Sequence, residues 1–349
     1  SATVPVAGAK SKMNHRNVLF RGGKDVTSQV LPYSRFDSSD PQDLWEYLKD
    51  YEEKTQGQVL AIPHNSNLSG GFTFQTNTLK GEAFTQEYAS ERSRWEPIVE
   101  ITQRKGDGET HPLVSPTDEF ADYETHIWSK IGGATLKEAK SYARPALKEG
   151  LNQYAKLGVN PFKFGVIGST DAHNSLSTAS EDNYWGSTAL GEASPYRTRI
   201  AAMDRAASGY AAVWAIENTR EAIFDALLRR EVYASTGPRI TVRFFGGWNY
   251  VPKDLLNPTP AQIGYSKGVP MGSDLSLAPR NVSPSFLIQA VKEADGANLD
   301  RVQVIKGWRD SNGQLHQKIY KVALSDGRFE AAEGGGSKIN TTVHIKNAS

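Results

Sequence analysis

The segment "VIGSTDAHN" (residues 166–174) joins an apolar run to two side chains that can do chemistry, Asp171 and His173. In an extended chain, residues two apart share a face, so this carboxylate and this imidazole are expected to point to the same side. They follow a segment that reads as a buried strand, and α/β folds place their reactive groups just past such strand ends. The pair therefore predicts a metal-binding or proton-transferring site here.

Two earlier apolar segments carry residues of the same kind. "VLAIPHN" (59–65) contains His64 near its end, and "EPIVEITQ" (96–103) contains Glu100. If the strands are parallel, their C-terminal ends lie on one rim, and these side chains meet there. Imidazole and carboxylate ligands without a thiolate suit Zn²⁺, Mn²⁺ or Fe²⁺. Such an ion lowers the pKa of bound water to about 7 and supplies a hydroxide nucleophile.

Each of these residues also has a structural interpretation. His64 can be a hydrogen-bonded structural histidine, and Glu100 can face solvent or pair with an arginine. His111, in "GETHP", can be a surface residue of a loop. Asn65 and Asn174 each follow a candidate ligand directly, and we expect them to orient a ligand or contact the substrate.

The composition excludes several classes of protein. The 349 residues are 38% hydrophobic and 23% charged, which is typical of a globular protein. A formal net charge of +1, without a stripe of Lys and Arg interleaved with aromatics, argues against a nucleic-acid partner. The absence of cysteine excludes disulfides, a thiolate nucleophile and Cys-ligated metals. No apolar run is long enough to span a membrane, and the first residues do not form an intact signal peptide.

Residues 40–238 alternate between apolar and helical patterns. Strands are expected at 59–65, 96–103, 162–174, 210–217 and 232–236. Helices are expected from residue 41 to about residue 55, at 80–93, and at 134–155 with a break near Pro145. Two further helices are expected to begin at residue 195 and after an N-cap at Asn218. This alternation predicts parallel strands with helices outside them. It favours a barrel-like arrangement over a doubly wound sheet, but the pattern alone leaves both open.

The character of the chain changes after Pro238. Short β segments are expected at 240–248, 284–294, 300–308 and 317–327, with another suggested over 333–349. Asn312-Gly313 lies between two of them and indicates a hairpin turn. We therefore expect two domains, an α/β portion over 1–238 and a β-rich appendage over 239–349.

Several longer segments carry a resemblance to a known family. "HRNVLFRG", "LAIPHNSNLSGG", "EPIVEITQRKGDGETHP", "GVIGSTDAHN", "ALLRREVYASTGPRI" and "VQVIKGWRDSNG" together resemble the DUF3604 family, over nearly the whole chain. That family is similar to the PHP (polymerase and histidinol phosphatase) superfamily of metal-dependent phosphoesterases. The resemblance implies a distorted (β/α)₇ barrel with a centre of two or three metal ions at its C-terminal rim.

The resemblance also implies roles for individual residues. "IPHN" is similar to a His-Pro-type motif, which makes His64 a metal ligand, and "STDAH" is similar to a closing Asp-x-His motif, which makes Asp171 and His173 ligands. Glu100 matches a Glu that follows the His motif in related sequences. "GETHP" is typical of the DUF3604 group and implies that His111 faces the substrate or acts as an acid or base.

One motif of the superfamily is missing from this chain. The PHP pattern opens with His-x-His on the first strand, whereas here His15 stands alone in "MNHRN". We therefore expect that the first part of the barrel is missing or is supplied by another chain, either an N-terminal segment or a second copy in a homo-oligomer. The resemblance also suggests an exported protein, periplasmic or extracellular.

The leading functional hypothesis is a metal-dependent hydrolase acting on a small-molecule ester, with phosphate esters as the expected class. His64, Glu100, Asp171 and His173 would hold divalent metal, Zn, Mn or Fe. A metal-bound hydroxide would attack the ester, and Lys105 or a second ion would stabilise the developing oxyanion.

Two other classes stay open. One is a non-catalytic binding or structural protein on a degenerate hydrolase scaffold, with Trp248 or Trp308 lining a binding face. The other is a sugar isomerase or aldolase on a (β/α) barrel, although no lysine has the context of a Schiff-base residue.

Overall fold

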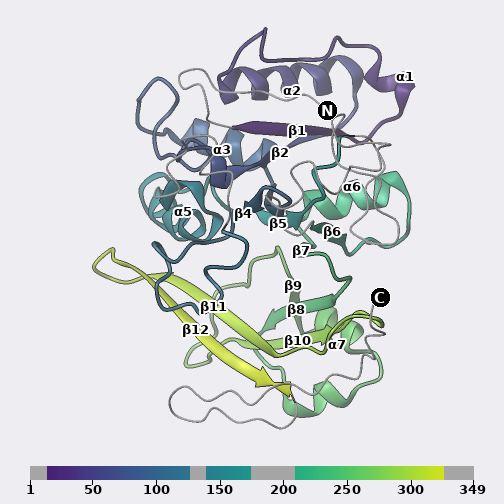
Figure 1. The fold of residues 1–349 in the computed structure, drawn as a ribbon, viewed down its shortest axis with the longest axis vertical. Helices are drawn as coiled ribbons and strands as arrows, with labels where there is room; N and C mark the ends of the chain where they lie inside the picture. The colour runs from purple at the N-terminus through teal and green to yellow at the C-terminus, as the bar shows by residue number, and fades with distance from the viewer. Residues whose placement is uncertain (1–13, 126–138, 174–208, 326–349) are drawn as a thin grey trace, which may run out of the picture. The chain divides into compact units, whose positions relative to one another are not determined.

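The computed structural model of the chain describes residues 14–125, 139–173 and 209–325 (Figure 1). The chain forms two compact units. One is made of Ser1–Gly237 and Ser311–Gly313, and the other of Pro238–Asp310 and Gln314–Ser349. The residues with candidate chemistry at strand ends all belong to the first unit.

In the part of the chain that the structure describes, the first unit contains three small sheets. β1 (His15–Phe20) pairs antiparallel with β2 (Val59–His64); β3 (Ile98–Gln103) pairs parallel with β5 (Gly165–Gly168) and antiparallel with β4 (Gly106–Asp107); β6 (Tyr210–Val213) pairs antiparallel with β7 (Val232–Ser235). β2 lies beside β3, and β5 lies beside β7, so the three sheets follow one another in space.

The predicted distorted (β/α)₇ barrel is wrong. In the described residues the strands form small and mostly antiparallel sheets, and they close no barrel. The sequence pattern misled for two physical reasons. β1 falls in a stretch that reads as loop, and it pairs antiparallel with β2. In addition, two strands that are connected by a helix need not be parallel. The helix α6 (Arg220–Leu228) connects β6 to β7, and these two strands are antiparallel.

The helices begin where the chain offers caps. α2 (Pro41–Thr55) has the predicted N-cap, because the Asp40 carboxylate accepts a hydrogen bond of 3.1 Å from the backbone N–H of Gln42. α3 is Gln86–Trp95 and α5 is Ala143–Leu157, and the short α1 is Lys24–Thr27. Pro145 does not break α5, since it lies in the first turn, where its missing N–H costs nothing. The N-cap of α6 is Thr219 and not the predicted Asn218.

The two faces of these strands build two different cores. Val99 and Ile101 of β3 belong to a large apolar cluster that includes residues of α2, α3 and α5. Ile98, on the opposite face, belongs to a second cluster with residues of β2, β5, α6 and β7. Because side chains alternate along a strand, Glu100 shares the second face with Ile98. Both faces therefore build apolar cores, and the second face also carries Glu100.

Gly168 allows β5 to lie close to β6 and β7. A Cβ atom at this position would lie 2.7 Å from the carbonyl oxygen of Ser235 and 2.9 Å from that of Tyr210. Backbone atoms cannot move aside as a flexible side chain can, so a glycine is required where these strands meet. This close approach fixes the end of β5, the strand that leads into Asp171.

The second unit contains two further antiparallel sheets. β8 (Thr241–Gly247) pairs with β10 (Ser285–Val291) and with β9 (Gly268–Pro270), and β11 (Arg301–Arg309) pairs with β12 (Leu315–Leu324). The unit also contains the helix α7 (Pro260–Lys267). The predicted hairpin is confirmed: Gly313, with φ 84°, lies between β11 and β12.

Some expectations fall outside this description. The predicted helix from residue 195 and the suggested strand over 333–349 lie outside the described residues. Within those residues, none of the helices has the length and apolar composition that crossing a membrane requires.

A buried ion pair connects β1 to the residues just before β3. Arg16 Nε lies 2.9 Å from Glu96 Oε1, and both side chains are 2% exposed. Arg92 Nη2 lies 3.3 Å from the other carboxylate oxygen, Oε2. Trp45 donates a hydrogen bond of 3.2 Å from its Nε1 to Glu96 Oε1. Burial alone would raise the pKa of Glu96, but the two guanidinium groups outweigh it and lower the pKa below its usual value.

We therefore predict that Arg16→Met lowers the free energy of unfolding by about 3–5 kcal/mol, because Glu96 is left buried with part of its charge uncompensated. The measurement is urea unfolding followed by tryptophan fluorescence. The control is Arg94→Met: Arg94 also pairs with a glutamate, Glu52, but its side chain is 43% exposed. The control should cost about 1 kcal/mol or less. Equal costs for the two variants would contradict the prediction.

Candidate functional site

The register of β1 on β2 brings two histidines together. His15 lies opposite His64, and their ring centroids are 5.3 Å apart. Directly opposed residues of an antiparallel pair point to the same face. His15 had no role in the sequence analysis, because its significance depends on a strand that the sequence pattern did not reveal. Its only signal was its place at the start of the short apolar segment "HRNVLF".

Glu100 comes to the same place from β3. Its Oε1 atom lies 3.9 Å from His64 Nδ1 and accepts a hydrogen bond of 3.4 Å from the backbone N–H of Asn65. Ser169, just past β5, donates a short hydrogen bond from its hydroxyl to Oε2. Burial raises the pKa of Glu100 to about 7; the Ser169 hydrogen bond opposes this rise, and the negative charge of Asp171 adds to it.

Asp171 sits in a strained backbone conformation, with φ 52° in the left-handed region. Its carboxylate is 7% exposed and pairs with two cations, Arg104 (Nε to Oδ2, 3.0 Å) and Lys105 (Nζ to Oδ2). His173 Nε2 lies 3.2 Å from Oδ1. Burial would raise the pKa of Asp171, but Lys105 and Arg104 outweigh burial and hold it at about 2. Burial, with Arg104 nearby, lowers the pKa of Lys105, although Asp171 opposes this.

We call His15, His64, Glu100, Lys105, Asp171 and His173 the polar cluster. The structure thus brings together the four residues predicted as metal ligands and the lysine predicted to stabilise an oxyanion, and it adds a histidine. Mutual electrostatic effects connect the members: the charges of Lys105 and Asp171 act on both His15 and His64.

A directed chain of hydrogen bonds orients His64. The backbone N–H of Lys105 donates to Gln103 Oε1 (2.8 Å), Gln103 Nε2 donates to Asn65 Oδ1 (2.6 Å), and Asn65 Nδ2 lies 2.9 Å from His64 Nδ1. A backbone N–H can only donate, so it sets the direction of the whole chain, and His64 Nδ1 accepts. In the neutral ring the proton is then on Nε2. Within the described part of the chain, this buried Nε2 has no hydrogen-bond partner.

Asn65 therefore orients a ring of the polar cluster, whereas two other predicted residues are not seen there. His111 accepts a hydrogen bond of 3.1 Å from the backbone N–H of Leu113 through Nδ1, and its ring lies 5.6 Å from that of Tyr142. No described contact joins His111 to the polar cluster. Asn174 lies outside the described residues.

The loop that carries His111 has its own anchor. Arg144, at the start of α5, pairs with both Glu109 and Asp118, and this holds the two parts of the loop against the helix. In the other unit, Trp248 donates to Ser276 and the Trp308 ring stacks on that of His316.

The polar cluster does not form a closed coordination shell. Among the residues that the structure describes, no three His, Asp or Glu side chains are grouped so that they could hold one ion. The reason lies in the pairings above: Asp171 faces Arg104 and Lys105, and Glu100 accepts from Ser169 and Asn65. The arrangement offers two neutral imidazoles, His15 and His64, together with two carboxyl groups and two cations.

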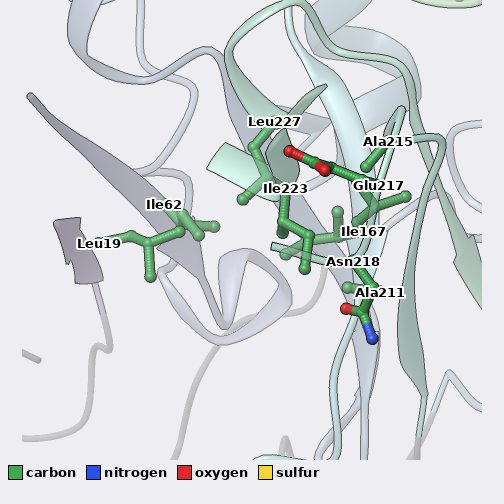
Figure 2. A pocket seen from close by; sticks show the side chains of 10 residues that line it. Leu19, Ile62, Ile167, Ala211, Ala215, Glu217, Asn218, Ile223 and Leu227 are labelled. Atoms are coloured by element: carbon green, nitrogen blue, oxygen red, sulfur yellow. The ribbon is translucent and has the colours of Figure 1, made fainter. Parts of the chain in front are cut away.

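A cavity of about 660 Å³ lies on the second face of the same strands (Figure 2). Its walls are mostly aliphatic, and a carboxylate and an amide also line it. The lining residues are Leu19, Ile62, Ile167, Ala211, Val213, Ala215, Glu217, Asn218, Ile223 and Leu227. Ile62 precedes His64 by two residues on β2, so the cavity and the polar cluster share one face of that strand.

Comparison with known proteins identifies the family. The model of a family described as "Protein of unknown function (DUF3604)" matches residues 6–349, so the chain belongs to this family. No curated protein matches the chain, and no solved structure matches it.

The buried imidazoles predict a pH dependence of stability. Burial is the main cause that lowers the pKa of His64 to about 3 and that of His15 to about 4. Below pH 6.5 the unfolded chain binds protons that these folded histidines do not. The free energy of unfolding of the metal-free protein should therefore fall as the pH falls from about 6.5 to about 4. Urea unfolding at a series of pH values measures this, and His64→Gln should make the profile shallower. An unchanged slope in His64→Gln would contradict the prediction.

Proposed function

We propose that this DUF3604 protein is a metal-dependent hydrolase of phosphate esters, with a site of the kind found in the PHP superfamily. One observation carries the proposal. Histidines from β1 and β2, a glutamate from within β3 and an Asp-x-His pair that follows β5 lie near one another, beside a lysine and an arginine. Side chains of these types are costly to gather in a buried place, and functional sites are where such gatherings occur.

The donor set supports binding of a divalent ion. Near neutral pH the lowered pKa values leave His15 and His64 as neutral imidazoles and Asp171 as a carboxylate, which are the forms that ligate metals. The unpartnered Nε2 of His64 is a buried polar atom that such an ion would satisfy. His15, His64, Glu100, Asp171 and His173 would hold the ion, and Zn²⁺, Mn²⁺ and Fe²⁺ suit these ligands.

Ligation requires local rearrangement. With Nδ1 of His64 accepting from Asn65, the ring proton occupies Nε2. For Nε2 to ligate, this proton must move to Nδ1, and the Asn65 amide must turn its oxygen toward the ring. Asp171 must in turn exchange contacts with Arg104 and Lys105 for the ion. Turning the Asn65 amide also breaks its hydrogen bond with Gln103, whose direction is fixed by the backbone N–H of Lys105.

The chain's own residues supply the rest of the chemistry. When bound, a divalent ion supplies a Lewis acid and makes bound water more acidic. Lys105 and Arg104 provide two positive charges at one carboxylate, so a phosphate group at the same place meets donors of the right sign as negative charge develops on its oxygens. Gln103 and Asn65 hold the His64 ring in orientation.

A non-catalytic binding protein is the second candidate. It is favoured by the two cations that already neutralise Asp171, since a degenerate site would keep such a balanced arrangement without any metal. The sugar isomerase or aldolase hypothesis has no support of this kind, because it depended on the barrel.

The proposal is tested by metal binding and hydrolysis together. Calorimetric titration with Mn²⁺ or Zn²⁺ should show binding that Asp171→Ala abolishes. His64→Gln, which removes one imidazole ligand, should weaken binding. Hydrolysis of p-nitrophenyl phosphate should follow the same order and stop when a chelator is added. The control is His111→Ala, which lies away from the polar cluster and should bind metal as the parent does. A full-length protein that binds neither ion overturns the proposal and favours the binding protein.

Lys105→Gln separates the two roles assigned to this region. Removal of the ammonium group frees the Asp171 carboxylate, so the affinity for the metal should rise. The same change removes a donor to the phosphate, so kcat/KM for p-nitrophenyl phosphate should fall by roughly 10²–10³. Calorimetry and steady-state kinetics measure the two effects. Lys140→Gln, at an exposed lysine that contacts Thr76, is the control. Weaker metal binding in Lys105→Gln would contradict this division of roles.

A further inference from the structure

The aliphatic cavity has the dimensions and chemistry of a small-molecule site. Its volume of about 660 Å³ lies within the range of roughly 300–1,000 Å³ that is usual for ligand pockets. Figure 2 shows Leu19 and Ile62 on one side of it and Ile167, Ile223 and Leu227 on the other. Glu217 and Asn218 are its polar lining residues, and both are exposed.

Residues that line the cavity share a strand face with members of the polar cluster. Ile62 and His64 are two residues apart on one face of β2, a separation of roughly 7 Å in extended chain. On β5, Ile167 stands in the same relation to Ser169, which binds Glu100. In the register of β1 on β2, Leu19 is four residues from His15, so it shares the face that carries both histidines. A ligand whose reacting group lies in the polar cluster therefore has an aliphatic wall beside it.

The polar cluster and the cavity carry different charged residues. Lys105 and Arg104 lie in the region of the polar cluster, whereas Glu217 is the charged residue that lines the cavity. When Asp171 exchanges these contacts for a metal ion, Lys105 and Arg104 become donors for an anionic group, whereas the cavity, lined by Glu217, suits an uncharged and apolar group.

We propose that the cavity binds the alcohol portion of the substrate, and that the substrate is a phosphate monoester of an apolar alcohol. This assignment rests on the proposed function. The phosphate occupies the polar cluster, and the hydrocarbon contacts Ile62, Ile167 and Ile223. Burial of apolar surface then makes binding tighter with each added methylene, by roughly fourfold where the group is fully buried.

The test compares ethyl phosphate with n-hexyl phosphate. With metal supplied, kcat/KM should rise with chain length by up to roughly fourfold per methylene. Independently of turnover, 1-hexanol should bind the metal-free protein in a calorimetric titration, and ethanol should not. Ala215→Phe, which places a ring in the cavity, should bring kcat/KM for hexyl phosphate down to the value for ethyl phosphate and abolish hexanol binding.

Ile216→Phe is the matched control, because Ile216 is adjacent in sequence but 90% exposed and does not line the cavity. It should keep the preference of the parent protein for the longer ester. If Ala215→Phe does not fold, Ala211→Leu fills the same cavity from β6 and should act in the same direction.

The outcomes separate the two proposals. Equal kcat/KM values for the two esters overturn the apolar-alcohol assignment and leave the hydrolase proposal intact. Absence of hexanol binding also overturns the assignment, and if the chain then sediments as a dimer, a second copy covers the cavity. Absence of turnover with both esters in metal-loaded protein overturns the hydrolase proposal and the substrate class with it.

Discussion

The buried pairing of Arg16 with Glu96 is the interaction on which the candidate site depends. Glu96 lies two residues before β3, and Arg16 follows His15 on β1, so the pair connects one sheet to the next. Since neighbouring residues of a strand point to opposite faces, an Arg16 held within the core directs His15 to the other face. The register that results puts His15 opposite His64. A charge buried for structural reasons on one face thus positions an imidazole on the other.

The two faces of the strands differ in how they are covered. On the first face, Val99 and Ile101 pack in a cluster with residues of three helices, α2, α3 and α5. On the second face, the apolar cluster includes residues of α6, and the cavity opens beside it. This space is lined mainly by aliphatic side chains and has the volume of a ligand pocket, so we interpret it as room for a ligand. Alternation along a strand makes this possible, because one segment can serve a core and a site at once.

Sequence reasoning identified the local features and missed the tertiary ones. Strands β2, β3 and β7 were predicted within two residues at each end, whereas the predictions over 162–174 and 210–217 extend well past the ends of β5 and β6. The helix α2 was recognised because Asp40 and Pro41 are strong local signals of a helix start. The direction of pairing was not predictable, since it depends on which strands meet and not on their own composition. Strand β1, with the sequence HRNVLF, begins with three polar residues and lacks the longer apolar run that marks β2, so it was not predicted and His15 was given no role. The ion pairs of Asp171 with Arg104 and Lys105 join residues far apart in sequence, so no local sequence pattern predicts them.

The charge balance of the polar cluster explains how such a site stays stable without a ligand. An isolated buried carboxylate is costly, and at Asp171 two cations remove most of that cost. Glu100 lacks an equivalent ion pair, and its raised pKa of about 7 means that it avoids the cost by holding a proton part of the time. His15 and His64 avoid it by remaining neutral. Asp171, Glu100 and the two buried histidines thus reduce the cost of burial in different ways. Each of these groups can still interact with a bound ion. Asp171 also keeps a strained backbone conformation, with φ 52°. Strain of this kind persists where the surrounding contacts hold it, and Asp171 is the residue that contacts Arg104, Lys105 and His173.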